Sequence, residues 1–213
     1  MKTYAVKEAY YTLQGEGAQT GRAAVFLRFT GCNLWSGLER DRSAAVCSFC
    51  DTDFVGTDGP GGGRFSRDDL VAHVRALWTA VAGDQGTPYI VCTGGEPALQ
   101  LDDGLIGALH GAGFEIGIET NGTKVLPAGL DWICVSPKAD APLQQTTGHE
   151  LKLVYPQALA PPENFAALHF DHFFLQALDG PETEANIAAC IDYCRVHPQW
   201  RLSLQTHKTL GID

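Results

Sequence analysis

Apolar and polar positions alternate in several short segments of the chain, which is the pattern of β-strands. Residues 4–12 alternate and are rich in Tyr and Val, and residues 24–30 (AVFLRFT) form a similar segment. Short apolar segments predict further strands at residues 89–92, 114–119, 132–135, 151–155, 173–176 and 201–206. We therefore expect a sheet to which most of the chain contributes.

Helical periodicity separates several of these strands. Behind the N-cap candidate Ser66, apolar residues recur at helical spacing at Leu70, Val74, Leu77, Trp78 and Val81. Further helices are predicted at residues 102–111, 162–168 and 181–197. Strands that alternate with helices favour parallel βα units. Because the helices are too few for a full barrel, the predicted fold is α/β, a partial, shortened (β/α) barrel of mostly parallel strands.

Polar or charged residues follow the C-terminal ends of most predicted strands. They lie at Thr93 to Glu96, Glu119 to Asn121, Ser136 to Lys138, Gln176 and His207. In a barrel of parallel strands this edge carries the active site. Each segment alone is equally well explained as an ordinary turn, but their recurrence at strand ends favours a functional site.

Length and charge narrow the class of protein. A chain of 213 residues predicts one domain spanning 1–213, with a loop insert at about 32–50 and a flexible glycine-rich stretch at 56–63. A net charge of −10 argues against nucleic-acid binding and favours a small-molecule substrate. Since we find neither an apolar run long enough to cross a bilayer nor a signal-peptide core, we expect a soluble, cytoplasmic protein without membrane contact.

Three cysteines, Cys32, Cys47 and Cys50, share one predicted loop, and no histidine lies near them in the sequence. The total of seven scattered cysteines fits reduced thiols or metal ligands better than disulfides. Thiolates suit both zinc and iron–sulfur clusters, although a structural zinc site requires a fourth ligand. Three thiolates can hold three irons of a four-iron cluster and leave the fourth open. The spacing of the cysteines alone is compatible with both a zinc site and an iron–sulfur cluster.

Two neighbouring features add a family resemblance. Phe49 precedes the last cysteine of the loop, and residues 94–97 (GGEP) follow a predicted strand. With the cysteines, they resemble the radical S-adenosylmethionine (SAM) superfamily, in which the corresponding residues contact SAM. The usual spacing there is Cys-x3-Cys-x2-Cys, whereas residues 33–46 make the first gap here fourteen residues long. The resemblance implies a [4Fe-4S] cluster with an open iron that binds SAM.

Further motifs narrow the resemblance to one family. Residues 13–17 (LQGEG), Arg28, residues 50–53 (CDTD), residues 119–122 (ETNG) and residues 205–208 (QTHK) occur in this order. The set is similar to the 7-carboxy-7-deazaguanine synthase family, in a long-insert form. The resemblance implies a carbon–nitrogen lyase that contracts 6-carboxy-5,6,7,8-tetrahydropterin to 7-carboxy-7-deazaguanine and releases ammonia, on the route to 7-deazapurines such as queuosine in tRNA. It also implies Mg²⁺, a flavodoxin-like electron donor and a homodimer.

The resemblance assigns a role to each motif. Residues implied to bind SAM are Phe49, Cys50, Asp51, Gly95, Glu96, Glu119, Asn121, Ser136, Pro137, Lys138 and Gln176. Thr52 is implied to ligate Mg²⁺, and Cys32, Cys47 and Cys50 the cluster. Residues implied to contact the substrate are Leu13, Gln14, Gly15, Glu16, Arg28, Thr93, His207 and, through the terminal carboxylate, Asp213. Catalytic contributions are expected from Gln14, Glu16, Arg28 and His207. A C-terminal tag is therefore expected to impair activity.

Two other functions compete with this interpretation. An activating enzyme for glycyl-radical proteins would keep the cluster and SAM but act on a protein partner. A zinc-stabilised binding module would use the same cysteines without catalysis. Zinc without acid-labile sulfide would support the second alternative, whereas magnesium independence and radical transfer to a protein would support the first.

Overall fold

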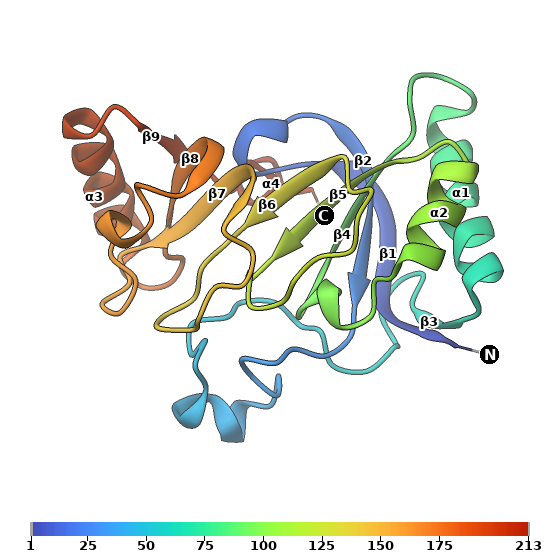
Figure 1. Ribbon diagram of the computed structural model, residues 1–213, viewed down its shortest axis with the longest axis horizontal. Helices are drawn as coiled ribbons and strands as arrows, with labels where there is room; N and C mark the ends of the chain where they lie inside the picture. Colours follow the sequence, from blue (N-terminus) through green and yellow to red (C-terminus); the bar gives the residue numbers. More distant parts are fainter. Residues whose placement is uncertain (1, 213) are drawn as a thin grey trace.

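The computed structural model describes residues 2–212 and contains one nine-stranded sheet (Figure 1). In spatial order the strands are β3 (Gly63–Phe65), β1 (Tyr4–Leu13), β2 (Ala23–Phe29), β4 (Tyr89–Gly94), β5 (Glu115–Thr120), β6 (Trp132–Val135), β7 (Thr147–Tyr155), β8 (His169–Ala177) and β9 (Trp200–Ser203). Strands β2 to β9 are parallel, and β1 is antiparallel to both β2 and β3. The two edge strands do not pair with each other, so the barrel stays open and the predicted partial barrel is confirmed.

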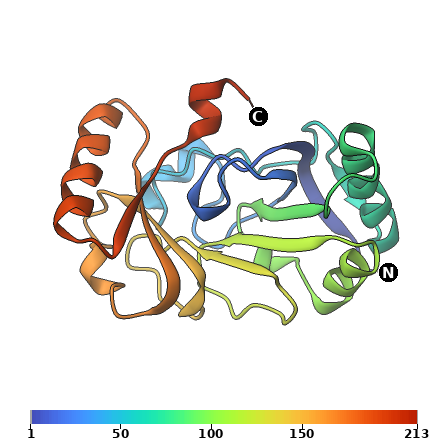
Figure 2. The same cartoon turned by 90° about the horizontal axis from the view of Figure 1, so that it is seen from above.

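Three longer helices cover the outer face of this sheet. Helix α1 (Arg67–Ala82) packs on β1 and β2, and α2 (Asp103–Gly111) packs on α1 and β5 (Figure 1). Helix α3 (Thr183–Val196) packs on β8 and β9 at the other end of the sheet. The short helix α4 (Thr206–Leu210) lies apart from them, near the C-terminus (Figure 2). Within residues 2–212, no helix has the length and apolar character that a membrane crossing requires.

The apolar periodicity accounts for helix α1. Leu70, Val74 and Trp78 are buried against β1 and β2, and the hydroxyl of Ser66 caps the helix by accepting a hydrogen bond from the Asp69 amide. Helix α2 begins in the same way, with Asp102 accepting from the Leu105 amide. The predicted helices at both positions are therefore confirmed, as is the cap at Ser66, whereas the cap at Asp102 was not predicted.

Three local expectations are wrong. The segment predicted as a helix at 162–168 forms only the 3-10 turn η4 (Pro162–Asn164). The last strand ends at Ser203, so His207 lies on α4 and not at a strand end. The glycine-rich stretch is ordered along β1, because the Gly59 amide donates to the Lys7 carbonyl and the Ala9 amide donates to the Pro60 carbonyl. Long-range backbone pairing overrides the flexibility that glycine suggests.

Candidate active site

Two adjoining cavities open at the C-terminal edge of the parallel strands. The first has a volume of about 200 Å³ and contains the cysteine loop, and the second has a volume of about 350 Å³ and lies beside β1 and β2. Residues that line both are Glu16, Asp51, Thr52, Thr93, Glu119 and Gln205. The polar strand ends therefore meet in one place, as expected for a parallel barrel.

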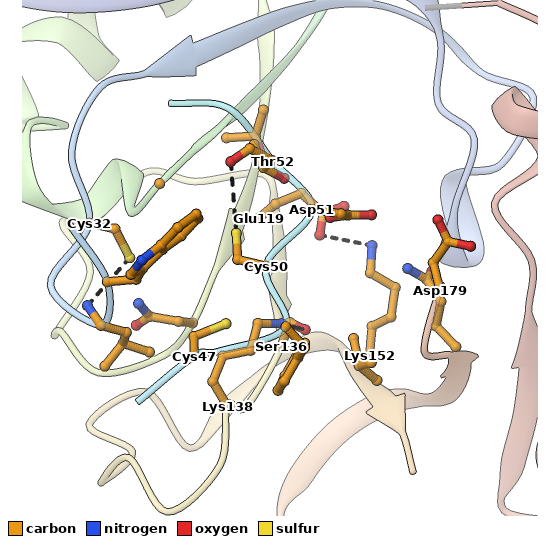
Figure 3. A pocket seen from close by; sticks show the side chains of 18 of the residues that line it. Cys32, Cys47, Cys50, Asp51, Thr52, Glu119, Ser136, Lys138, Lys152 and Asp179 are labelled. Carbon is orange, nitrogen blue, oxygen red and sulfur yellow. Dashed lines mark hydrogen bonds and ion pairs between the residues drawn. The ribbon is translucent and has the colours of Figure 1, made fainter. Parts of the chain in front are cut away.

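The three loop cysteines all line the first cavity, where Figure 3 shows them around one part of the pocket. The long insert does not separate them, because the Leu34 carbonyl accepts hydrogen bonds from the amides of Val46 (3.1 Å) and Cys47 (3.4 Å). These bonds close the insert at its base and bring Cys47 back beside the start of the loop. The insert itself forms the 3-10 helix η2 (Glu39–Ala44).

The cysteine loop suits a cluster better than a single ion. Among residues 2–212, no three His, Cys, Asp or Glu side chains are placed to hold one metal ion, and no fourth cysteine lines the cavity. A cluster distributes its ligands over several irons, so its thiolates need not converge on one point. The hydrogen bond from Cys47 lowers the pKa of Cys50 to about 6, whereas that bond and burial raise the pKa of Cys47. Cys50 is thus the thiol readiest to ionise.

The Gly94–Gly95 pair is required by a close approach of two chain segments. A Cβ atom on Gly94 would lie 2.1 Å from the Phe29 carbonyl oxygen, and one on Gly95 would lie 2.1 Å from the Gly31 carbonyl oxygen. Gly94 also has a φ of +132°, which favours glycine. The amides of Gly95 and Glu96 donate to the same segment, at Phe29 and Gly31. The pair therefore positions the chain that leads into Cys32.

Glu96 and Pro137 do not line either cavity, although the resemblance assigned them to the SAM site. The Glu96 side chain is buried and accepts hydrogen bonds from the Ala98 amide (2.9 Å), the Thr120 hydroxyl (2.7 Å) and the Asn121 amide (2.8 Å). Burial nevertheless raises the pKa of Glu96. Its carboxyl group therefore ties the end of β4 to the end of β5.

The other residues assigned to SAM do gather in the first cavity. They are Phe49, Cys50, Asp51, Gly95, Glu119, Asn121, Ser136, Lys138 and Gln176. Lys138 donates to the Ser136 hydroxyl at 2.5 Å, and the Asn121 amide nitrogen donates to Asn33 at 3.1 Å. Strands β5, β6 and β8 thus each contribute polar groups to the same wall.

The described residues assigned to the substrate line the second cavity. They are Leu13, Gln14, Gly15, Glu16, Arg28, Thr93 and His207. Arg28 donates to Glu8 at 2.7 Å in a salt bridge, and it also lines the cavity. Burial opposes the charge on Arg28, but the hydrogen bond to Glu8 keeps its pKa raised. Asp213, assigned to the substrate through its carboxylate, lies outside the described residues.

The LQGEG segment packs against helix α4, near the C-terminal end of the chain, and against strand β7. A Cβ atom on Gly15 would lie 2.3 Å from the His207 ring, and one on Gly17 would lie 1.9 Å from a Glu150 carboxylate oxygen. The Gly15 carbonyl accepts from the amide and the hydroxyl of Thr206. The glycines therefore allow α4 and β7 to approach this loop, which places His207 in the cavity wall.

Sequence reasoning missed several residues of the site, above all Lys152. This lysine lies 2.7 Å from Glu16 and 2.9 Å from Glu119, and its side chain is only 4% exposed. Gln205 donates to Glu16 at 2.9 Å, and Lys208 pairs with Asp51 at 3.0 Å. A signal for Lys152 existed, because residues 150–153 (ELKL) place charged side chains on one face of an otherwise apolar strand.

Several known proteins are similar to this chain over its full length. No family model matches the chain. It is 64% identical to the 7-carboxy-7-deazaguanine synthases of Caulobacter vibrioides and of Bradyrhizobium diazoefficiens, with 99% of both chains covered in each case. The crystal structure of QueE from Escherichia coli superposes with a TM-score of 0.69 at 28% identity, covering 95% of this chain and 93% of the other. Identity of this extent over the whole length shows that the chain belongs to the 7-carboxy-7-deazaguanine synthase family.

Proposed function

We propose that this protein converts 6-carboxy-5,6,7,8-tetrahydropterin to 7-carboxy-7-deazaguanine with loss of ammonia, as a radical SAM enzyme on the route to queuosine and related 7-deazapurines. The observation that carries the proposal is the pair of adjoining cavities, one containing the three cysteines and the other the LQGEG loop and Arg28. The full-length relatives support this function over a glycyl-radical activating enzyme or a zinc-binding module.

The residues of the first cavity fit a [4Fe-4S] cluster and SAM. Cys32, Cys47 and Cys50 would hold the cluster, and the polar groups at the ends of β5, β6 and β8 would bind SAM beside it. When bound, this pair would supply the one-electron chemistry, while the protein supplies orientation and exclusion of water. The glycine pair at 94–95 brings the β4 backbone within reach of the loop, where a side chain would not fit.

The second cavity offers donors and acceptors that suit a carboxylated pterin. Arg28 donates through Nε to Glu8 and through Nη2 to the Tyr10 hydroxyl, so Nη1 and the second Nη2 hydrogen would pair with the substrate carboxylate. Gln14 and Glu16 provide an amide and a carboxylate for the amide-like edge of the pterin, and His207 of α4 lies against Gly15 between them. The residues that line both cavities would then hold the substrate next to SAM.

Thr52 is the proposed protein ligand of Mg²⁺. It lines both cavities, and the carboxylates on either side of it are already engaged, Asp51 by Lys208 and Asp53 by Lys7 at 2.8 Å. The hydroxyl can therefore supply one oxygen at the boundary, with the substrate carboxylate and water completing the shell. We also propose, by analogy with the family, a homodimer that receives electrons from a flavodoxin-like protein.

An anaerobic turnover assay tests the proposed function. Protein with an untagged C-terminus would be reconstituted with iron and sulfide and given dithionite, SAM, Mg²⁺ and the tetrahydropterin. Mass spectrometry is expected to detect 7-carboxy-7-deazaguanine and 5′-deoxyadenosine together. Cys47→Ala is expected to abolish both products, whereas Cys194→Ala, which changes a thiol on α3 away from both cavities, is the matched control.

Each assay result has a defined meaning. Deoxyadenosine without the deazaguanine would contradict the proposed substrate while keeping radical SAM chemistry. Neither product from a protein with a full complement of iron and sulfide would contradict the proposed reaction altogether. Omission of Mg²⁺, and Thr52→Ala compared with Thr52→Ser, test the metal separately, because only the serine variant keeps the hydroxyl.

A further inference from the structure

A buried lysine connects the two cavities through two carboxylates. Lys152 lies on β7, where Leu151 and Leu153 face the outer core that α3 covers, so Lys152 points to the inside of the barrel. Its ammonium group lies 2.7 Å from a Glu16 oxygen and 2.9 Å from a Glu119 oxygen. Figure 3 shows Lys152 reaching toward Glu119 across the pocket. Both glutamates line both cavities, whereas Lys152 lines only the first.

We propose that Lys152 is a positioning residue that holds the Glu16 and Glu119 carboxylates side by side at the boundary of the two cavities, and so presents Glu16 to the substrate in its charged form. The inference rests on the proposed function for the part that concerns the substrate. The part that concerns the charge of Glu16 does not rest on the proposed function, because it can be tested on the protein without any ligand.

Electrostatics explain why Glu16 needs this partner. Burial works to raise the pKa of Glu16, but the charge and hydrogen bond of Lys152, together with the Gln205 amide and His207, lower it to about 2. Burial likewise works against the charge of Lys152, yet Glu119 and Glu16 keep its pKa well above the ordinary value. A buried charge without a partner is strongly disfavoured and takes up or loses a proton instead.

The surrounding elements add charges of their own. Glu150 lies two residues before Lys152 on β7 and accepts hydrogen bonds from the Ala18 amide (2.9 Å) and the Cys134 thiol of β6 (3.5 Å). Burial raises the pKa values of Glu150 and of Cys134. Lys152 is therefore the cation that pairs with the carboxylates of Glu16 and Glu119, while Lys138, the other lysine that lines the first cavity, donates to Ser136. The charge of His207 on α4 also acts on Glu16.

The charge of Glu16 can be measured without cluster, SAM or substrate. The protein would be labelled with ¹³C at glutamate side-chain carboxyls, and the Glu16 resonance would be identified by its loss in Glu16→Gln. In the unsubstituted protein we expect Glu16 to stay ionised down to about pH 3. In Lys152→Met we expect its titration to move upward by about three pH units. Ionised Glu16 at about pH 4 in that variant would overturn the proposal.

Two further variants separate charge from packing. Lys152→Arg keeps a cation and is expected to restore most of the ionisation of Glu16, while the exposed Lys124→Met leaves it unchanged. If Lys152→Met does not fold, Lys152→Met with Glu119→Gln removes the repulsion between the two carboxylates and still leaves Glu16 without its lysine. An unshifted Glu16 in the double variant would equally overturn the proposal.

Binding of 6-carboxypterin, an oxidised analogue of the substrate, tests the second part. We expect Lys152→Met to bind it about tenfold more weakly than the unsubstituted protein at pH 4 and to recover affinity as the pH rises toward 7, because Glu16 regains its charge. A loss of affinity that is equal at every pH would indicate a purely structural role and contradict the proposal. The unsubstituted protein could fail to bind the analogue although Lys152→Met shifts the Glu16 titration. That result would contradict the proposed function but support the conclusion that Lys152 keeps Glu16 charged.

Discussion

The turn at Gly94 and Gly95 leaves no space for a Cβ atom at either residue. In Gly95→Ala the new methyl group would lie 2.1 Å from the Gly31 carbonyl oxygen and 2.9 Å from the Cys32 Cβ, and neither is the free end of a flexible side chain. We expect this variant to lower the free energy of unfolding by about 1–3 kcal/mol and to displace the cysteine loop. Urea unfolding monitored by circular dichroism measures the change.

A matched glycine provides the control for this prediction. Gly107 is exposed on α2, and a Cβ atom there meets nothing within 4 Å. Gly107→Ala is expected to raise the free energy of unfolding by about 0.5–1 kcal/mol, because alanine restricts the unfolded chain and suits a helix. Equal effects of the two substitutions would contradict the steric argument.

The ionisation of Glu16 predicts a pH-dependent contribution to stability. Its pKa is about 2 in the fold against an ordinary value of 4.5, so the carboxylate stabilises the fold above about pH 4.5 and loses this effect as the pH falls toward 2. By linkage the contribution at neutral pH is about 3 kcal/mol. We expect unfolding free energies of the unsubstituted protein and Glu16→Gln to differ most near pH 6 and to converge only as the pH falls to about 2. A constant difference over this range would refute the assignment.

At the scale of elements, the insert acts on the cysteine loop through Arg42. Its guanidinium donates to the Ser48 carbonyl (2.9 Å) and the Cys50 carbonyl (3.0 Å) and lies over the Trp35 ring. We expect Arg42→Ala to release iron and sulfide about tenfold faster than the unsubstituted protein during anaerobic incubation with a chelator, because charge-assisted hydrogen bonds of this kind are each worth about 1.5–3 kcal/mol.

The neighbouring Arg40 is the control for the insert. Its side chain is 79% exposed, and within residues 2–212 its ion pair is with Asp41, at 3.7 Å. Arg40→Ala is expected to retain iron and sulfide like the unsubstituted protein. If both arginine variants lose them at the same rate, the insert stabilises the loop by its general charge and not through the Arg42 contacts.

Elements with a clear apolar period were predictable, and those set by distant partners were not. Helix α1 follows from its own stripe of Leu70, Val74 and Trp78 and from its cap. Strand β3 and helix α4 were missed, because β3 exists through pairing with β1, and α4 contacts the Gly15 carbonyl of a loop near the other end of the chain. Segments that short carry too little periodicity to be identified alone.

At the scale of the whole molecule, Lys208 joins the C-terminal helix to the active-site edge. It pairs with Asp51 of the cysteine loop at 3.0 Å and with Asp179, which follows β8, at 2.5 Å. We expect Lys208→Met to raise the KM for the pterin about fivefold with a smaller change in kcat, because α4 and His207 would be held less firmly. Steady-state kinetics measure this, with Lys124→Met as the control.

The opposite kinetic pattern would contradict this account. A fall in kcat at unchanged KM would show that Lys208 acts on the chemical step rather than on the position of α4 and His207. The side chains of Lys208 and Asp179 are each 40% exposed, so salt screens their ion pair. High salt is therefore expected to reduce the difference in KM between Lys208→Met and the unsubstituted protein.

The sequence by itself determined the partial parallel barrel, the three-cysteine loop and most of the two residue sets that line the cavities. These features are local, since strand periodicity, cysteine spacing and polar strand ends are read over a few residues each. Only the tertiary structure decided that the insert closes at Leu34, that Glu96 joins β4 to β5 and that Lys152 lies between Glu16 and Glu119. The physical reason is that these contacts join separate segments of the chain, from the two ends of one loop to Glu16 and Lys152 on distant strands and loops, and only the folded chain brings those segments together.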